Sequence, residues 1–131
     1  MATAYRQITA ANAAKLDALA GGAIVRGQPV QATNAPIQPT DVFTVKLCAD
    51  GLRPDGTAID AIDLGGTGRF APRSSAALPA LLGGAVVAGD LLKVSSGKWI
   101  KCSPEDQAWM RALQAGSSGD LVNAEPCDRT A

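Results

Sequence analysis

The sequence predicts a small, mainly β fold, a β-barrel or β-sandwich of short antiparallel strands with long loops. Residues 42–48, VFTVKLC, alternate apolar and polar side chains, which indicates a strand with one buried face. Residues 91–102 have the pattern of a β-hairpin, and glycine, proline and aspartate separate segments of this kind. These three observations together favour one β-rich domain.

The composition predicts a thin hydrophobic core. The chain has 131 residues, the size of one ordinary domain, with 47% hydrophobic but only 4% aromatic residues. Much of the hydrophobic content is alanine, whereas large apolar side chains supply most burial free energy, roughly 1.5–3 kcal/mol each. We therefore expect partner subunits to contribute to stability.

The N-terminal segment has a different texture from the rest. Residues 9–20, TAANAAKLDALA, favour a short helix that Thr9 caps and Gly21 ends, with an arm docked on a neighbour as the alternative. The expected organisation is thus an N-terminal arm or short helix over residues 1–20. A single β-rich domain follows over residues 21–131.

A loop-rich insert is expected at about residues 50–82. It opens with ADGLRPDG, whose two Asp-Gly pairs and proline mark a turn. Residues 58–64 have the composition of a short strand. Residues 71–82 are expected to form a long loop with one helical turn at most, because Pro79 interrupts any longer helix.

The hairpin is the best-defined local structure. It pairs residues 91–94 with residues 98–102 around a three-residue loop, Ser95-Ser96-Gly97, whose glycine takes the left-handed conformation. Ser103 and the following PED then resemble a helix start, and local signals extend that helix to Gln114. A last short strand is expected over residues 121–124.

One stretch occurs twice. GGAIVRGQPVQ, from Gly21, and GGAVVAGDLLK, from Gly83, share glycines, an alanine and a valine at matching positions. Chance similarity between glycine- and alanine-rich stretches is one interpretation. The other is two copies of a strand–turn–strand unit in which Gly27 and Gly89 make the reversal, packed together as a small barrel or sandwich.

The sequence offers no candidate catalytic, cofactor-binding or metal site. It contains no histidine, and its three cysteines lack metal-ligand spacing, so they are expected to be reduced thiols. Charges balance, with 12 basic and 12 acidic residues and no basic patch, so no nucleic-acid partner is expected. No apolar run approaches the ~18 residues of a membrane span, and the N-terminus does not resemble a signal peptide.

Residues 83–126 resemble the head decoration, or capsid cement, proteins of tailed bacteriophages. The resemblance rests on AGDLL at 88–92, SGK at 96–98, ALQAG at 112–116 and GDLV at 119–122, in this order and spacing. It implies a barrel-like β fold, often a trimer, that binds the outside of an assembled capsid. It also implies one turn and then a strand after Ser103, and a hairpin turn over residues 116–120.

The expected function is therefore structural and non-enzymatic: a virion protein that binds the outer capsid surface and stabilises it. Its partners would be the major capsid protein and itself, as a homotrimer or a dimer, with no membrane and no small-molecule substrate. It would be made in the bacterial cytoplasm. Another virion subunit (neck, tail or fibre base) is the alternative, and a small ligand-binding β-barrel is a more distant one.

Candidate residues follow from expected exposure. Trp99 shares a mixed strand face with Lys101, which suits an interface rim, although core packing of Trp99 is the competing interpretation. The capsid-contact candidates are Tyr5, Arg6, Arg69, Phe70, Arg73 and Leu78; the intersubunit candidates are Trp99 and Lys101; the turn glycines are Gly27, Gly89, Gly97, Gly116 and Gly119.

Overall fold

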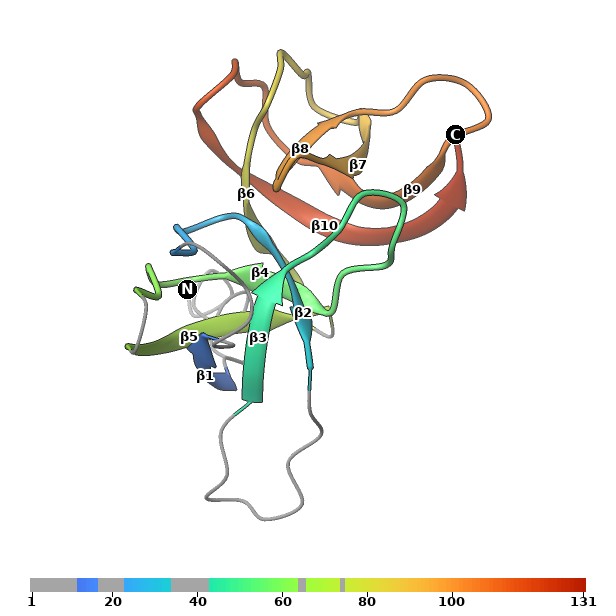
Figure 1. Cartoon of the computed structure of the whole chain (residues 1–131). Helices are drawn as coiled ribbons and strands as arrows, with labels where there is room; N and C mark the ends of the chain where they lie inside the picture. The colour runs from blue at the N-terminus through green and yellow to red at the C-terminus, as the bar shows by residue number, and fades with distance from the viewer. Residues whose placement is uncertain (1–11, 17–22, 34–42, 64–65, 74) are drawn as a thin grey trace.

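The computed structural model describes residues 12–16, 23–33, 43–63, 66–73 and 75–131, and these form strands, turns and loops without a helix (Figure 1). Ten strands fall into two groups that follow each other along the chain. The mainly β fold class is thereby confirmed. The strands are β1 (Asn12–Leu16), β2 (Pro29–Ala32), β3 (Phe43–Leu47), β4 (Gly56–Ala58), β5 (Thr67–Pro72), β6 (Leu78–Leu81), β7 (Leu91–Ser95), β8 (Lys98–Lys101), β9 (Gln107–Ala112) and β10 (Leu121–Thr130).

The first group is a closed barrel with the strand order β1-β3-β2-β4-β5. β1 and β3 run parallel, and the other neighbours are antiparallel. Phe43 and Phe70 meet edge to face inside it, with ring centroids 5.3 Å apart. The buried apolar side chains of this first barrel are Ala14, Leu16, Ile24, Val30, Val45, Ala58, Ile62 and Phe70.

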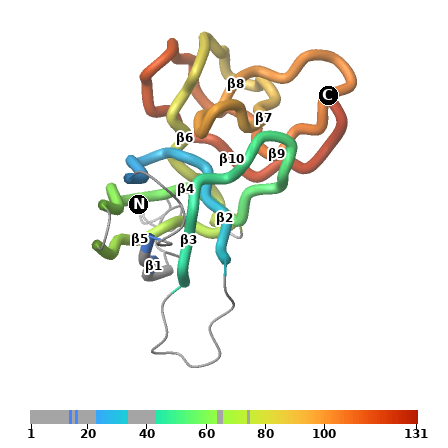
Figure 2. Tube along the Cα trace, in the orientation of Figure 1, coloured from blue at the N-terminus to red at the C-terminus, as the bar shows by residue number. Residues whose placement is uncertain are grey.

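The second group is a five-stranded sheet with the order β6-β10-β9-β7-β8. A parallel bridge between Leu82 and Trp99 brings its two edges together, so the sheet is rolled into a second, more open barrel. Trp99 is the largest buried side chain of this core, and Leu78, Leu92 and Met110 are fully buried with it. Figures 1 and 2 show this second barrel above the first.

The two barrels have the same topology in the same chain order. If strands β1 to β5 are renumbered β6 to β10, each pair of neighbouring strands in the first barrel becomes a pair of neighbouring strands in the second. The registers also match: Val30 pairs with Leu47 in the first barrel as Leu92 pairs with Lys101 in the second. The parallel contact of Leu16 with Val45 corresponds to that of Leu82 with Trp99. The fold is therefore a tandem duplication of one five-stranded barrel.

Turns correspond as closely as strands. Residues 25–28 and residues 87–90 each form a turn whose third residue, Gly27 or Gly89, has a φ of 89° or 94°. In each, the last side chain accepts a hydrogen bond from the first backbone N–H: Val25 to Gln28 Oε1 and Val87 to Asp90 Oδ2, at 2.8 and 2.9 Å. The described part of the repeat, residues 23–31 and 85–93, thus marks equivalent positions, and each copy belongs to its own barrel.

The two barrels join where the second is open. In the first barrel β1 and β3 pair at three positions, whereas the described pairing between β6 and β8 is the single bridge at Leu82. The turn 25–28 fills the remaining seam: Leu81 N donates to Gly27 O at 2.9 Å, and Gln28 Nε2 donates to Gly97 O at 3.0 Å. A Cβ on Gly27, where φ is 89°, would lie 2.7 Å from the backbone nitrogen of Leu81, so this contact favours glycine.

Two predictions about organisation are wrong. The described part of the predicted helix over residues 9–20 is strand β1, because its residues find partners on β3 and β5. β1 therefore belongs to the first barrel rather than to a separate arm. The expected insert at residues 50–82 instead contributes β4, β5 and β6, including Pro79 within β6.

The C-terminal predictions hold with local corrections. β3 and the β7–β8 hairpin are confirmed, but Ser95 pairs with Lys98, so the loop has two residues, Ser96 and Gly97. Both have positive φ, 52° and 74°, the combination of a type I′ turn. A turn and then strand β9 follow Ser103 as the resemblance implied, and β10 extends far beyond the expected residues 121–124.

Candidate interaction surface

The structure removes two predicted capsid contacts from the surface. Phe70 is 2% exposed in the first core and Leu78 is 0% exposed in the second. Their side chains complete the hydrophobic cores, so the prediction that they contact a capsid is wrong. Tyr5 and Arg6 lie outside the described residues.

Arg69 is exposed and held by one carboxylate. Its Nε and Nη2 donate to the two oxygens of Asp60 at 2.9 and 3.2 Å, in a two-pronged pair on the surface of the first barrel. The hydrogen bond from Arg69 lowers the pKa of the Asp60 carboxyl. Both groups are therefore charged at neutral pH, and Arg69 stays a candidate contact.

Arg73 has a structural position. Its Nη1 donates to Trp109 O at 2.8 Å and its Nη2 pairs with Asp128, which also accepts two hydrogen bonds from Arg53. Only 10% of the Arg73 side chain is exposed, and burial lowers the pKa of its guanidinium. Arg73 thus links the first barrel to the second, and little of it is available to another protein.

Trp99 and Lys101 both lie on β8, but they differ in burial. Trp99 is 0% exposed, so the prediction that it contacts another subunit is wrong and core packing is correct. Its indole N–H has no hydrogen-bond partner within the described part of the chain. The Lys101 side chain is 61% exposed, with Nζ 3.8 Å from Asp90 Oδ1.

Four of the five predicted turn glycines are confirmed by a positive φ: Gly27, Gly89, Gly97 and Gly119. Gly116 is different. It forms a bridge with Val86, and a Cβ there would lie 2.8 Å from Val122 Cγ1 and 2.9 Å from Leu82 Cδ1. Close packing rather than backbone conformation therefore requires glycine at this position.

The far end of the second barrel carries two equivalent turns side by side. Residues 87–90 and residues 117–120 flank the Val86–Gly116 bridge, at the top of Figure 1. Asp90 and Asp120 each accept the first backbone N–H of their own turn, at 2.9 and 2.8 Å, which fixes the turn shape. We call residues 85–90, 113–120 and Lys101 the distal end.

Apolar side chains are exposed at the distal end. Val87 is 59% exposed and Leu113 is 39% exposed. Beside them lies a shallow hollow of about 170 Å³, lined by Ala85, Val86, Val87, Asp90 and Lys101. An apolar hollow next to an exposed lysine suits the side chain of a protein partner, since apolar contact supplies affinity and charge sets orientation.

Sequence reasoning missed most of the distal end. Lys101 was predicted on the surface, but Val87 and Leu113 were not singled out. The repeat held a usable signal: Val25, at the same turn position as Val87, is also exposed, at 46%. Val25 and Val87 are the first residues of equivalent surface turns, and neither core requires an apolar side chain at this position.

The described residues show neither a metal cluster nor a membrane-spanning helix. No group of three or more cysteine, aspartate or glutamate side chains is placed to hold a metal ion there. The same residues include no helix that is long and apolar enough to cross a bilayer.

Comparison with known proteins gives a fold. No protein-family profile and no curated protein sequence matches the chain. Among solved structures, the head fiber gp8.5 N base of bacteriophage phi29 is similar, with a TM-score of 0.71 at 16% sequence identity. The alignment covers 92% of this chain and 96% of that one. The two proteins therefore share their architecture over nearly their whole lengths.

Proposed function

We propose that the chain is a structural protein of a bacteriophage virion that binds the outside of the head. The observation that carries the proposal is the fold shared with a phage head fiber base over nearly the full length of both chains. The resemblance of residues 83–126 to head decoration proteins supports the same assignment from the sequence. In this role the chain acts by binding and performs no chemical reaction.

The stabilising mechanism would be mass action. A protein that binds the assembled shell and not its separated subunits shifts the equilibrium toward the shell. Contacts with several subunits of the major capsid protein would add avidity without strong single contacts. The distal end is the contact surface we favour, because it combines exposed Val87 and Leu113 with Lys101.

Co-sedimentation with expanded phage capsids that lack the protein tests this proposal. Saturable binding at hundreds of copies per particle, with a raised temperature or force of shell rupture, is expected. Val87→Glu should weaken binding at least tenfold, since it places a charge in an apolar contact. Leu52→Glu, at a residue 49% exposed outside the distal end, is the matched control and should bind normally. Absence of binding to intact capsids would refute the proposal.

A fibre-base role is the second candidate, and the description of the structural neighbour favours it. A fibre base would be present in fewer copies and would carry a projecting structure. Copy number per particle, measured by quantitative mass spectrometry of purified virions, separates the two roles. The predicted homotrimer is tested separately by sedimentation equilibrium of the purified chain.

A further inference from the structure

A concavity with both charged and aromatic walls lies on the outer face of the second barrel. It measures about 310 Å³, at the lower end of the roughly 300–1,000 Å³ range of small-molecule sites. Its floor comes from β7, β8 and β9, and the loop after β3 supplies one rim. The residues that matter for the argument are Asp50, Lys93, Ser95, Ile100, Asp106 and Trp109.

The internal duplication shows that the fold does not require this set of side chains. The matching registers place Gln31 at the position of Lys93, and Lys46 at that of Ile100. Met110 pairs with Leu92 as Gly56 pairs with Val30, so Met110 and Gly56 are equivalent. The residue before Gly56, Asp55, is therefore the counterpart of Trp109. Asp55 accepts the Ala32 N–H at 2.8 Å, which is a structural use. The first barrel forms the same strands without an aromatic residue there.

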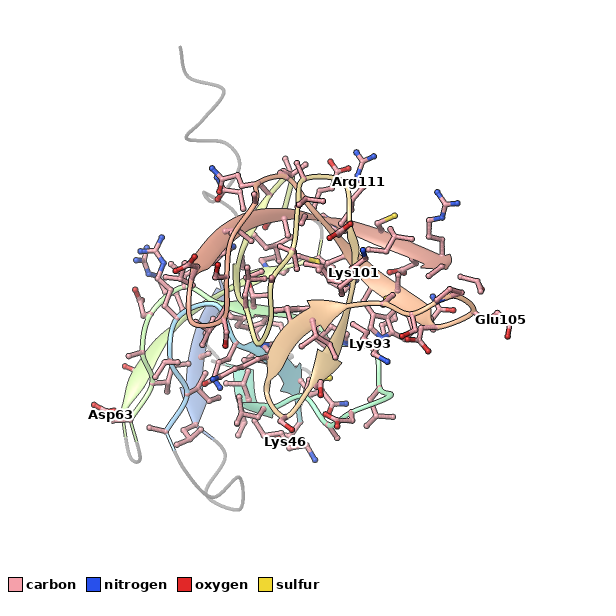
Figure 3. All side chains as sticks on the ribbon, turned by 90° about the horizontal axis from the view of Figure 1, so that it is seen from above. Lys46, Asp63, Lys93, Lys101, Glu105 and Arg111 are labelled. Carbon is pink, nitrogen blue, oxygen red and sulfur yellow. The ribbon has the colours of Figure 1, made fainter. Side chains whose placement is uncertain are left out.

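The polar groups of the pocket are fixed in place. Lys93 Nζ donates to Asp106 Oδ2 at 2.7 Å, and the same oxygen accepts the Ser103 N–H at 2.8 Å. Asp50 Oδ1 accepts the Ser96 N–H at 2.8 Å. Figure 3 shows Lys93 on the strand beside the loop that carries Glu105. One ammonium and two carboxylates thus line the same pocket as the half-buried Trp109.

We propose that this pocket binds a sugar ring of an oligosaccharide. A sugar ring presents C–H groups on its faces, which pack on an indole, and hydroxyl groups at its edge, which both donate and accept hydrogen bonds. Asp50 and Asp106 accept, Lys93 donates, and Ser95 does both. The excess of carboxylates disfavours phosphate ligands, and the fixed charges disfavour a purely apolar one.

The inference is independent of the proposed virion role, because the isolated chain would bind sugar whether or not it binds a capsid. It departs from the expectation that the protein has no small-molecule ligand. The other ligand that these groups could take is a cationic side chain, which would stack on Trp109 and pair with the carboxylates. The experiment includes that ligand as a separate arm.

Saturation-transfer NMR on the full chain tests the proposal with cellotriose, maltotriose and the N-acetylglucosamine trimer. Saturable binding of at least one trimer at about millimolar dissociation constant is expected, since the site is shallow. Trp109→Ala and Lys93→Met should each weaken it at least fivefold. Lys46→Met, at an exposed lysine of the first barrel outside the pocket, should leave it unchanged.

Three results would overturn the proposal. The first is absence of saturable binding by all three trimers. The second is equal sugar affinity in the unaltered chain and in Lys93→Met. Lys93→Met is the smaller change, so it preserves the barrel if Trp109→Ala unfolds it. The third is saturable binding of N-acetyl-lysine methylamide without binding of any trimer, which would assign the pocket to a cationic side chain.

Discussion

Gly27 and Gly89 hold the same backbone conformation in two different surroundings. Both have a φ near 90°, but a Cβ on Gly27 would meet Leu121 and the backbone of Leu81, whereas a Cβ on Gly89 has nothing within 4 Å. Gly89→Ala should therefore cost only the backbone strain, about 1–2 kcal/mol. Gly27→Ala should cost about 2–5 kcal/mol, because overpacking of the seam is added.

Urea unfolding of the two variants measures the difference, and Gly89→Ala is the matched control for backbone conformation. Equal losses would mean that the seam tolerates a side chain at Gly27. In that case the close approach of the Leu81 backbone to Gly27 would not limit how the two barrels pack.

The structure predicts that Cys48 is the least reactive of the three thiols. Burial, with the negative charges of Asp55 and Asp50 nearby, raises the pKa of this thiol to about 11. The thiolate is the reactive form, so roughly 0.1% of Cys48 is reactive at pH 8. Iodoacetamide labelling followed by mass spectrometry should leave Cys48 unmodified in the native protein and modify it in urea. Native labelling of Cys48 as fast as that of the partly exposed Cys127 would contradict this.

At the scale of elements, the sequence predicted strands where a local pattern was sufficient. The alternation at Phe43, Val45 and Leu47 and the glycine of the β7–β8 hairpin both correspond to observed structure. β1 could not be predicted in this way. Its alanine and leucine favour a helix locally, but pairing with β3 and β5 determines its conformation, and those partners are distant in sequence.

The duplication was visible only where both copies kept the same turn. Glycines at Gly27 and Gly89 preserved that signal, because the turn requires a positive φ. Strand positions drifted, since Val45 and Trp99 can each fill the same place in a core of adjustable volume. The candidate surface was predicted poorly for the related reason that exposure depends on the second barrel, which covers Arg73 and leaves Val87 free.

The turn at residues 103–106 contains the Asp106 carboxylate, which accepts hydrogen bonds from Lys93 Nζ and from the Ser103 N–H. The hydrogen bond from Lys93, with the Ser103 N–H, lowers the pKa of Asp106. A carboxyl whose pKa is lower in the folded state than in the unfolded state stabilises the fold at pH values above its ordinary pKa of about 3.9. This stabilisation is lost as the pH falls through the lowered folded-state pKa. Asp106→Asn should therefore reduce the melting temperature at pH 7, and the difference from the unaltered chain should narrow below pH 4.

The control for this prediction is Asp120→Asn. Asp120 closes an equivalent turn by accepting the Ser117 N–H, and the described ion pairs do not include it. Asparagine can accept the same N–H, so its effect should be small at both pH values. A pH-independent difference for Asp106→Asn would show that the Lys93 pair does not stabilise the fold.

At the scale of the whole molecule, two barrels of one design are joined asymmetrically. The turn 25–28 enters the open seam of the second barrel, and Arg53 and Arg73 converge on Asp128 at an irregularity of β10. Among the described residues no second barrel packs against the equivalent turn 87–90, which is part of the distal end. The same element therefore serves as an internal joint in one copy and as a free surface in the other.

Asp128→Ala should uncouple the two barrels. It leaves the Arg73 guanidinium, which is largely buried, without its carboxylate, and we expect a loss of about 1–3 kcal/mol because Asp128 itself is 38% exposed.

Trp99 and Trp109 both lie in the second barrel, so tryptophan fluorescence follows that barrel alone, whereas far-UV circular dichroism follows both. In urea the two signals should change together for the unaltered chain and separate for Asp128→Ala. Asp60→Ala, which breaks the exposed pair with Arg69, should destabilise the chain less than Asp128→Ala does and keep the signals together. Coincident transitions for Asp128→Ala, with a loss no greater than that of Asp60→Ala, would mean that the seam alone joins the barrels.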